Sequence, residues 1–143
     1  MDNYIKVEFP GISCNESFAR GVAGAFATQL DITVEELADI KTAVSEAVTN
    51  AIVHGYAGTK GIVEMKCRIK DNDIEIDIID KGCGIKDVPL AMQPLYSSSE
   101  DDERSGMGFT VMQSFMDTVK VVSELGVGTT VSMTKKVGVL LDD

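Results

Sequence analysis

Hydrophobic and polar residues alternate along several segments of the chain, which is the pattern of half-buried β-strands. In the first segment Ile5, Val7 and Phe9 share one face and Pro10-Gly11 ends the run, as expected for an edge strand. Two further runs are joined by the polar sequence Asp71-Asn72-Asp73, which predicts a β-hairpin. The expected strands are residues 4–9, 62–70, 74–80, 119–123 and 129–135.

Two longer segments have apolar residues at helical spacing. The first helix is expected over residues 15–30, with Asn15 as its N-cap and with Phe18, Val22, Ala25, Phe26 and Leu30 on its buried face. The second opens with Thr33 and Glu36 at capping-box spacing and stops at Gly55. Its expected apolar stripe is Leu37, Ile40, Val44, Ala47, Val48, Ala51 and Ile52. A short third helix is expected at about residues 107–116.

Residues 81–105 interrupt these patterns with prolines, three consecutive serines and an acidic run. A loop of this length inside a compact domain is usually either functional or disordered. The 143 residues suit one domain spanning 1–143, which buries roughly 68–70% of the surface of the unfolded chain. The elements predict an α/β (α+β) two-layer sandwich, with the helices on one face of a mixed, mostly antiparallel sheet.

The formal net charge of −10 narrows the expected partners. Phosphates repel such a field, so we expect no direct binding of nucleic acid, whereas a basic protein would be attracted. Acidity of this kind also serves solubility alone. No segment has the pattern of a membrane span or a signal peptide, and the three cysteines lack metal-ligand spacing. We therefore expect a cytoplasmic protein with reduced thiols, without a membrane partner.

The second predicted helix carries Glu46, Asn50 and His54 at i, i+4 and i+8, in one row away from the apolar stripe. The amide oxygen of Asn50 suits a Mg²⁺-phosphate group, because Mg²⁺ prefers oxygen ligands. The carboxylate of Glu46, one turn away, is able to accept a proton from an attacking hydroxyl. The alternative is an ordinary solvated polar face.

The sequence Asp80-Lys81-Gly82-Cys83-Gly84-Ile85 follows a predicted buried strand. A carboxylate there is able to accept a hydrogen bond from the exocyclic amine of adenine, and the glycines let the backbone approach a flat base closely. A simple glycine turn after a strand explains the same residues.

Two further segments are rich in glycine. Arg104-Ser105-Gly106-Met107-Gly108 leads into a predicted helix, whose free N–H groups form an anion site suited to nucleotide phosphates. A flexible hinge and helix cap is the alternative. In Gly128-Thr129-Thr130, a threonine hydroxyl is placed to assist Asp80 at the adenine, although the segment alone indicates a β-turn.

The order and spacing of these segments resemble the ATP-binding core of the gyrase, Hsp90, histidine kinase and MutL (GHKL, or Bergerat-fold) superfamily. That resemblance covers nearly the whole chain, and it implies Mg²⁺ binding at Asn50, adenine binding at Asp80 and a lid at 86–105. We expect no additional domain of the kind that the gyrase, MutL and sensor-kinase branches carry. The segments NYIKVEFP, NESFAR, SEAVTNAIVHGY and ERSGMGFTVM are similar to the sporulation anti-sigma factors of spore-forming bacteria, a branch of free-standing serine kinases.

The resemblance implies that the protein holds a sigma factor away from RNA polymerase and phosphorylates an anti-anti-sigma factor on serine, using ATP and Mg²⁺. Glu46 would be the general base. The implied nucleotide contacts are Asn50, Asp80, Gly82, Gly84, Ile85, Arg104, Ser105, Gly106, Met107, Gly108 and Thr130. Where the family has a Thr-Thr-Lys-like stretch this chain has Ser97-Ser98-Ser99-Glu100, which leaves Arg104 as the expected cation of the lid.

The resemblance also suggests a homodimer, formed through the first helix and the opening strand. Arg20 on that helix is a candidate docking residue for an acidic patch on a partner, the alternative being an ordinary surface residue. Three other functions remain open: a nucleotide-gated binding module without catalysis, a stress-response anti-sigma kinase, and a free-standing ATPase.

Overall fold

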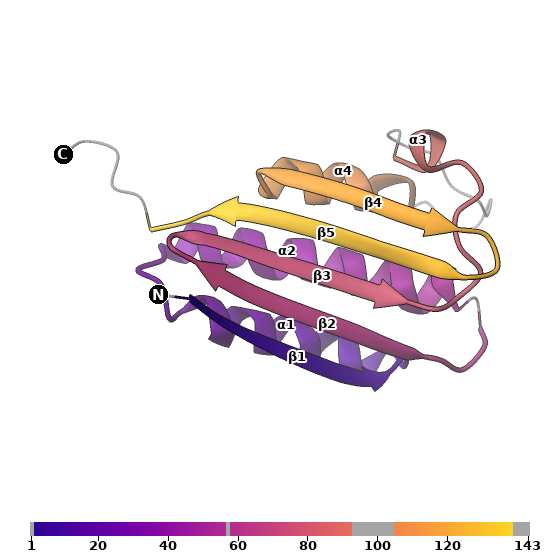
Figure 1. Cartoon of the computed structure of the whole chain (residues 1–143), viewed down its shortest axis with the longest axis horizontal. Helices are drawn as coiled ribbons and strands as arrows, with labels where there is room; N and C mark the ends of the chain where they lie inside the picture. Colours follow the sequence, from indigo (N-terminus) through magenta and orange to yellow (C-terminus); the bar gives the residue numbers. More distant parts are fainter. Residues whose placement is uncertain (1, 57, 93–104, 139–143) are drawn as a thin grey trace.

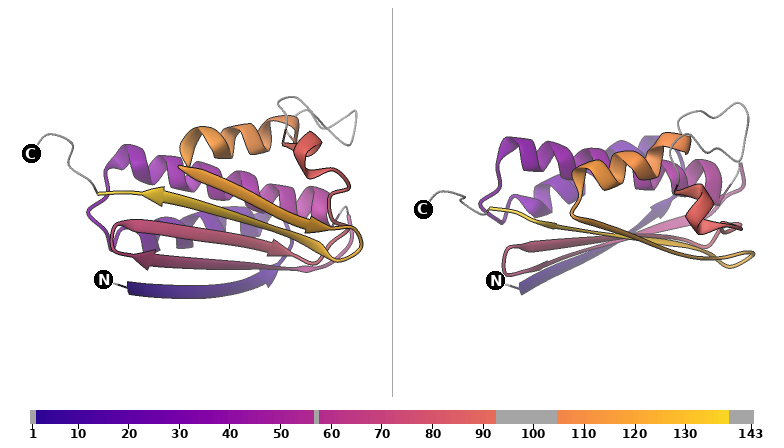
Figure 2. Two further views of the ribbon diagram at one scale, coloured as in Figure 1. Left: turned by 45° about the horizontal axis from the view of Figure 1, so that its top comes forward. Right: turned by 90° about the horizontal axis from the view of Figure 1, so that it is seen from above.

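The computed structural model describes residues 2–56, 58–92 and 105–138, as a five-stranded sheet with helices packed on one face (Figures 1 and 2). The strand order is β1-β2-β3-β5-β4. Along the chain the elements are β1 (Asp2–Pro10), α1 (Cys14–Ala27), α2 (Val34–Asn50), η1 (Ala51–Gly55), β2 (Ile62–Lys70), β3 (Asp73–Asp80), α3 (Val88–Ala91), α4 (Ser105–Phe115), β4 (Thr118–Glu124) and β5 (Gly128–Lys136). The expected two-layer α/β sandwich is confirmed.

Every strand pairing in the described residues is antiparallel. The sequence predicted a mostly antiparallel sheet, which is correct, but also some parallel pairing, which these residues do not have. Strands β3 and β4 are connected through the helical segment and run in the same direction. They do not pair with each other, because β5 lies between them and runs antiparallel to both. The last strand therefore occupies an interior position, and β1 is an edge strand as predicted.

The core lies between the sheet and the helices. Alternate residues of the two central strands face inward and are fully or almost fully buried: Val63, Met65, Cys67 and Ile69 of β2, and Ile74, Ile76 and Ile78 of β3. Helix α2 covers them with Ile40, Val44 and Val48, which belong to the predicted apolar stripe. This alternation is what sequence patterning predicts for a sheet with one buried face.

Helix α1 differs from its prediction at its start and on its buried face. It begins at Cys14 with Ser13 at the N-cap position, so Asn15 is already inside the helix, and its Nδ2 donates to the carbonyl of Pro10 at 2.9 Å. The buried residues are Ala19, Ala23, Gly24, Phe26 and Ala27, while Phe18 is 52% exposed. Small side chains let α1 lie close to α2, so packing favours the alanine face over the larger apolar residues.

Helix α2 begins with the predicted capping box. The backbone N–H of Glu36 donates to the Thr33 hydroxyl and the backbone N–H of Thr33 donates to the Glu36 carboxylate, both at 3.0 Å. After Asn50 the helix widens into a π-helical turn, η1, in which the Tyr56 N–H donates to the carbonyl of Ala51 at 3.0 Å. The helical segment thus ends at Gly55 as predicted, but through a turn that the sequence did not reveal.

The expected lid, residues 86–105, falls mostly on residues 93–104, which lie outside the described residues. Its first part includes the short helix α3, whose N-cap Asp87 accepts from the Leu90 N–H at 3.0 Å. Within the described ranges, no helix combines the length and the apolar character needed to cross a membrane.

Candidate functional site

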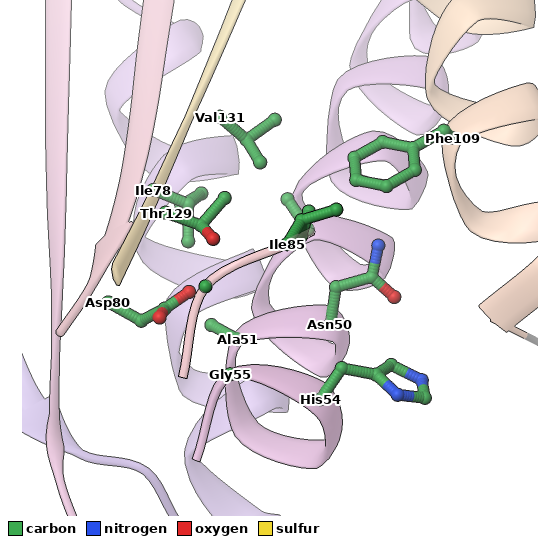
Figure 3. A pocket seen from close by; sticks show the side chains of 12 residues that line it. Asn50, Ala51, His54, Gly55, Ile78, Asp80, Ile85, Phe109, Thr129 and Val131 are labelled. Atoms are coloured by element: carbon green, nitrogen blue, oxygen red, sulfur yellow. The ribbon is translucent and has the colours of Figure 1, made fainter. Parts of the chain in front are cut away.

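A pocket lies at the end of the sheet where β3 finishes and β5 begins, opposite the C-terminal end of the α2–η1 helical segment (Figure 3). Its lining residues are Ala47, Asn50, Ala51, His54, Gly55, Ile78, Asp80, Gly84, Ile85, Phe109, Thr129 and Val131. An adjoining hollow shares five of these residues and is also lined by Cys83, Lys86, Asp87, Leu90, Ala91 and Leu125. The site is therefore an apolar slot with a few polar groups, the usual character of a small-molecule site.

Asp80 is the buried acidic group of this pocket, with 6% of its surface exposed. Burial raises the pKa of its carboxyl group, while hydrogen bonds from the backbone N–H groups of Gly82 and Thr129 lower it. The Gly82 N–H donates to Oδ1 at 2.9 Å. The carboxylate thus lies at the end of β3 in apolar surroundings, where a hydrogen-bond donor on a flat ligand would meet little competition from water.

The loop after Asp80 packs tightly against the end of the helical segment. A Cβ on Gly82 would lie 1.8 Å from the carbonyl oxygen of Gly55, and a Cβ on Gly55 would lie 2.7 Å from the Asp80 carboxylate. The Cys83 N–H donates to the same Gly55 carbonyl at 2.7 Å. Gly84 lines the pocket with a φ of +78°, and Ile85 beside it is a second lining residue. Gly82, predicted as a nucleotide contact, is not a lining residue, and it packs against Gly55.

Strand β5 contributes Thr129, not the predicted Thr130. Thr129 pairs with Asp80 in the sheet and lines the pocket (Figure 3), whereas Thr130 pairs with Ile79 and is not a lining residue. Successive side chains of a strand point to opposite faces, so only one of two neighbouring threonines is able to reach Asp80. Ser123 of β4 connects Thr129 with the loop after β3. Its hydroxyl lies 2.7 Å from that of Thr129 and accepts from the Ile85 N–H at 2.7 Å.

The α2–η1 segment supplies Asn50 and His54, which point into the same space (Figure 3). The expected straight row of Glu46, Asn50 and His54 is changed by the π-helical turn between the last two. Glu46 lies one helical turn before Asn50 and is half-buried, but it is not among the lining residues. Four residues of helix correspond to about 6 Å along the axis. Because Asp80 contacts Gly55 at the end of this segment, Glu46 is farther along the helix from Asp80 than Asn50 is.

Helix α4 brings its first turn to Asn50. A Cβ on Gly108 would lie 3.1 Å from the Asn50 Nδ2 and 3.2 Å from its Oδ1. The predicted residues Ser105, Gly106 and Met107 form the start of this helix, and Arg104 lies outside the described residues. The structure therefore brings the first turn of α4, at Gly108, next to the Asn50 amide.

Several lining residues were not singled out from the sequence as parts of a site. Phe109 closes the pocket from α4, and Ile78 and Val131 form its apolar wall (Figure 3). Strand alternation could have predicted Ile78 and Val131. Each lies two positions from a polar residue of the site, Asp80 or Thr129, and therefore on the same face of its strand. Phe109 carried no comparable signal.

Arg20 lies on α1, away from the pocket. Its guanidinium is 3.7 Å from the Glu16 carboxylate in an i, i+4 pair, and its side chain is 42% exposed. Glu16 also accepts a hydrogen bond from the Ser45 hydroxyl, which connects α1 to α2. Arg20 is thus a partly exposed cation whose position is supported by a second helix.

Comparison with known proteins identifies the family. The family model of the histidine kinase-like ATPase domain matches residues 15–135. An anti-sigma F factor from Thermoanaerobacter sp. (strain X514) is 57% identical over 136 residues, which cover 95% of each chain. Another from Clostridium acetobutylicum is 51% identical over 142 residues, covering 99% of each chain. The chain belongs to the anti-sigma F factor family.

Solved structures similar to this family member share its fold. The RsbU and RsbW domains of Rv1364c from Mycobacterium tuberculosis match with a TM-score of 0.69 at 18% identity, over 94% of this chain and 32% of that longer one. A histidine kinase domain from Erythrobacter litoralis matches with a TM-score of 0.57 at 20% identity, over 85% of this chain and 60% of that one. The GHKL-type fold expected from the sequence is therefore confirmed. A histidine kinase-like ATPase domain is an ATP-binding domain, so the pocket around Asp80 and Asn50 is the candidate ATP site of this family member.

Proposed function

We propose that the protein is an anti-sigma factor kinase that sequesters a sporulation sigma factor and transfers the γ-phosphate of ATP to a serine of an anti-anti-sigma protein. The observation that carries this proposal is the pocket that places a buried acceptor, Asp80, and an amide, Asn50, at two points of one slot. Asp80 would accept from the exocyclic amine of adenine, and the phosphates would extend past Asn50 toward the start of α4. Membership of the anti-sigma F factor family supports the choice of partners.

Mg²⁺ fits this site as an ion that enters with the nucleotide. Among the described residues, no group of three or more His, Cys, Asp or Glu side chains is arranged to hold a metal. The Oδ1 of Asn50 lies beside the Gly108 backbone, where the absence of a side chain leaves space. Mg²⁺ commonly takes one or two protein oxygens together with substrate phosphates and water, and it neutralises charge on the transferred phosphoryl group.

Glu46 is proposed as the general base. It would accept the proton of the partner's serine hydroxyl while that oxygen bonds to the γ-phosphorus and the bond to the ADP oxygen breaks. Its position one turn before Asn50, on the side away from Asp80, agrees with a site that has adenine at one end and the reacting phosphate at the other. The remaining predicted contacts, Arg104, Ser105, Gly106, Met107 and Gly108, are proposed to surround the phosphates.

The partner surface is proposed to include Arg20, and the homodimer is proposed to form through α1 and β1. Arg20 is a partly exposed cation in a chain of net charge −10, so it would attract an acidic patch. Strand β1 is at the sheet edge, with Tyr4 76% exposed, and Phe18 of α1 is also exposed beside Phe9. An open strand edge and exposed aromatic rings are features of protein–protein contacts.

Transfer of labelled phosphate from ATP to the anti-anti-sigma protein tests this proposal. We expect Glu46→Gln to keep ATP affinity within a few-fold and to slow transfer roughly 100-fold or more, because only the proton acceptor is lost. Glu35→Gln is the matched control, since Glu35 is an exposed glutamate in the first turn of the same helix. Arg20→Glu should reduce transfer by weakening partner binding, with ATP affinity unchanged.

The main alternative is a nucleotide-gated binding module without catalysis. It predicts ATP-dependent binding of the sigma factor but no phosphoserine on the other partner. Full transfer activity in Glu46→Gln would remove Glu46 from the mechanism, and absence of transfer by the wild type in the presence of bound ATP would favour the binding module.

A further inference from the structure

Tyr56 follows the π-helical turn and is buried, with 6% of its surface exposed. Its backbone closes that turn at one end, because its N–H donates to the carbonyl of Ala51 at 3.0 Å. Its carbonyl starts the next turn by accepting from the Thr59 N–H at 2.8 Å. Tyr56 is not among the lining residues of the pocket or of the adjoining hollow.

The hydroxyl group of Tyr56 joins two other segments of the chain. It donates to the carbonyl of Ile62, the first residue of β2, at 2.5 Å. It accepts from the backbone N–H of Lys81, the residue directly after Asp80, at 2.9 Å. A phenol hydroxyl donates one hydrogen bond and also accepts, so this one group bonds both Ile62 and Lys81. Phenylalanine is able to form neither bond.

The ring of Tyr56 is held in one orientation by two glycines. A Cβ on Gly61 would lie 2.1 Å from the ring, and a Cβ on Gly11 would lie 3.3 Å from it. The ring therefore occupies space that exists only because these two positions carry no side chain. Its hydroxyl is placed by packing, which means that it is already oriented before any ligand arrives.

The bond to Lys81 acts on Asp80. The Lys81 N–H belongs to the peptide unit that also contains the Asp80 carbonyl, so holding this N–H fixes the plane of the peptide. On its other side the Asp80 carbonyl is approached closely by Gly128, where a Cβ would lie 2.1 Å from the oxygen. Together with the Gly82 N–H on Oδ1, these contacts fix both the backbone and the carboxylate of Asp80.

We propose that Tyr56 is a positioning residue for base recognition: its hydroxyl fixes the peptide after Asp80 and thereby the direction in which the carboxylate meets the exocyclic amine of the base. This inference rests on the proposed function, since it assumes that Asp80 binds the base of the nucleotide. It assigns Tyr56 to the selection of adenine over bases without that amine, and not to contact with the nucleotide.

Comparison of ADP with inosine diphosphate tests the assignment, because hypoxanthine has a carbonyl oxygen where adenine has the amine. In Tyr56→Phe we expect ADP affinity to fall about tenfold with little change for inosine diphosphate, so that the ratio of the two affinities falls by the same factor. A general loss of folded protein would lower both affinities equally and leave the ratio unchanged. Tyr4→Phe is the matched control, because Tyr4 is exposed on the edge strand.

An unchanged ratio in Tyr56→Phe would overturn the positioning role. A wild-type protein that does not prefer ADP would instead overturn base recognition by Asp80, so the two failures are distinguishable. If the variant does not fold, hydrogen exchange of the wild-type protein decides the question without it. The Lys81 amide should be protected in nucleotide-free protein, and exchange at the rate of an unprotected amide would contradict the hydrogen bond on which the proposal depends.

Discussion

Thr129 and Thr130 are neighbours in the chain, but they lie on opposite faces of the sheet. The Thr129 side chain is 8% exposed and close to Asp80, whereas Thr130 is partly exposed and faces away from the helices. Alternation contained this information, since Thr129 shares its face with Val131 and Met133, which are buried. The Gly128-Thr129-Thr130 segment thus borders the pocket, but through Thr129 and not through Thr130, the residue predicted from the sequence.

The two threonines provide a matched pair of substitutions. Thr129→Val keeps the side-chain shape and removes the hydroxyl that lies between Ser123 and the pocket. We expect ATP affinity to fall about fivefold to tenfold, the usual effect of one lost hydrogen bond of about 1 kcal/mol. Thr130→Val should leave ATP affinity within twofold. Calorimetric titration of both variants with ATP measures this, and an equal effect of the two substitutions would contradict the assignment.

At the scale of elements, the loop after β3 completes the end of the α2–η1 helical segment. The last carbonyls of a helix lack partners within it, and here the Gly55 carbonyl accepts from the Cys83 N–H at 2.7 Å. The thiol of Cys83 is 3.2 Å from the carbonyl oxygen of His54, to which it donates. Loop and helix end therefore support each other, and a change in either one should alter the pocket between them.

Gly82→Ala tests this dependence. The added Cβ would lie 1.8 Å from the Gly55 carbonyl oxygen, so the loop has to move away from the helix end. We expect a loss of stability of about 1–3 kcal/mol, the usual cost of overpacking, and a tenfold or greater loss of ATP affinity. Urea denaturation and ATP titration measure the two effects.

Gly21→Ala is the control for that substitution. Gly21 is inside α1, and a Cβ there would meet nothing within 4 Å. Alanine should stabilise the protein by up to about 1 kcal/mol through helix propensity and should leave ATP affinity unchanged. If Gly82→Ala bound ATP as well as Gly21→Ala does, the close contact of loop and helix would not be needed for the site.

The elements differ in how well their sequences predict them. The capping box of α2 and the β2–β3 hairpin depend on local residues such as Thr33, Glu36 and Asp71, and all of these elements are present as predicted. The buried face of α1 depends on how closely two helices approach, which no local pattern records. The π-helical turn likewise ends at Gly55, which packs against Asp80, a residue 25 positions later in the sequence that no local pattern connects to it.

At the scale of the whole molecule, Asp80 opposes the stability of the protein that contains it. Burial raises the pKa of its carboxyl group in the folded state above the value in the unfolded chain. The folded state therefore binds more protons between the two pKa values, and the free energy of unfolding decreases as pH rises through that window. Above the folded-state pKa the full penalty of a buried carboxylate remains.

Asp80→Asn should remove this dependence. Relative to wild type, we expect the variant to gain stability as pH rises through the window, and then to keep a constant difference. Urea denaturation of nucleotide-free protein at a series of pH values measures the difference. We expect the same variant to lose roughly tenfold to a hundredfold in ATP affinity, as for a hydrogen bond to a charged group. A stability difference that is flat or decreases with pH would contradict the raised pKa.

The overall architecture was predictable because one face of each strand and helix is apolar, and the elements have few ways to bury those faces together. The order of the strands was not, because β5 enters the sheet between β3 and β4 and long-range pairing leaves no mark in local sequence. Asp80 and Asn50, in contrast, were predicted because each lies in a segment whose own sequence indicates a role. The role of Tyr56, which depends on Gly61 and Lys81 at once, required the structure.

The interior position of β5 also has a consequence for synthesis on the ribosome, which produces the chain from its N-terminus. Asp80 and Asn50 emerge early, but Thr129 and Val131, which form one wall of the pocket, belong to the last strand. A nascent chain that ends before β5 has neither that wall nor the strand that pairs with both β3 and β4. The pocket is therefore complete only when β5 has left the ribosome and has paired with β3 and β4.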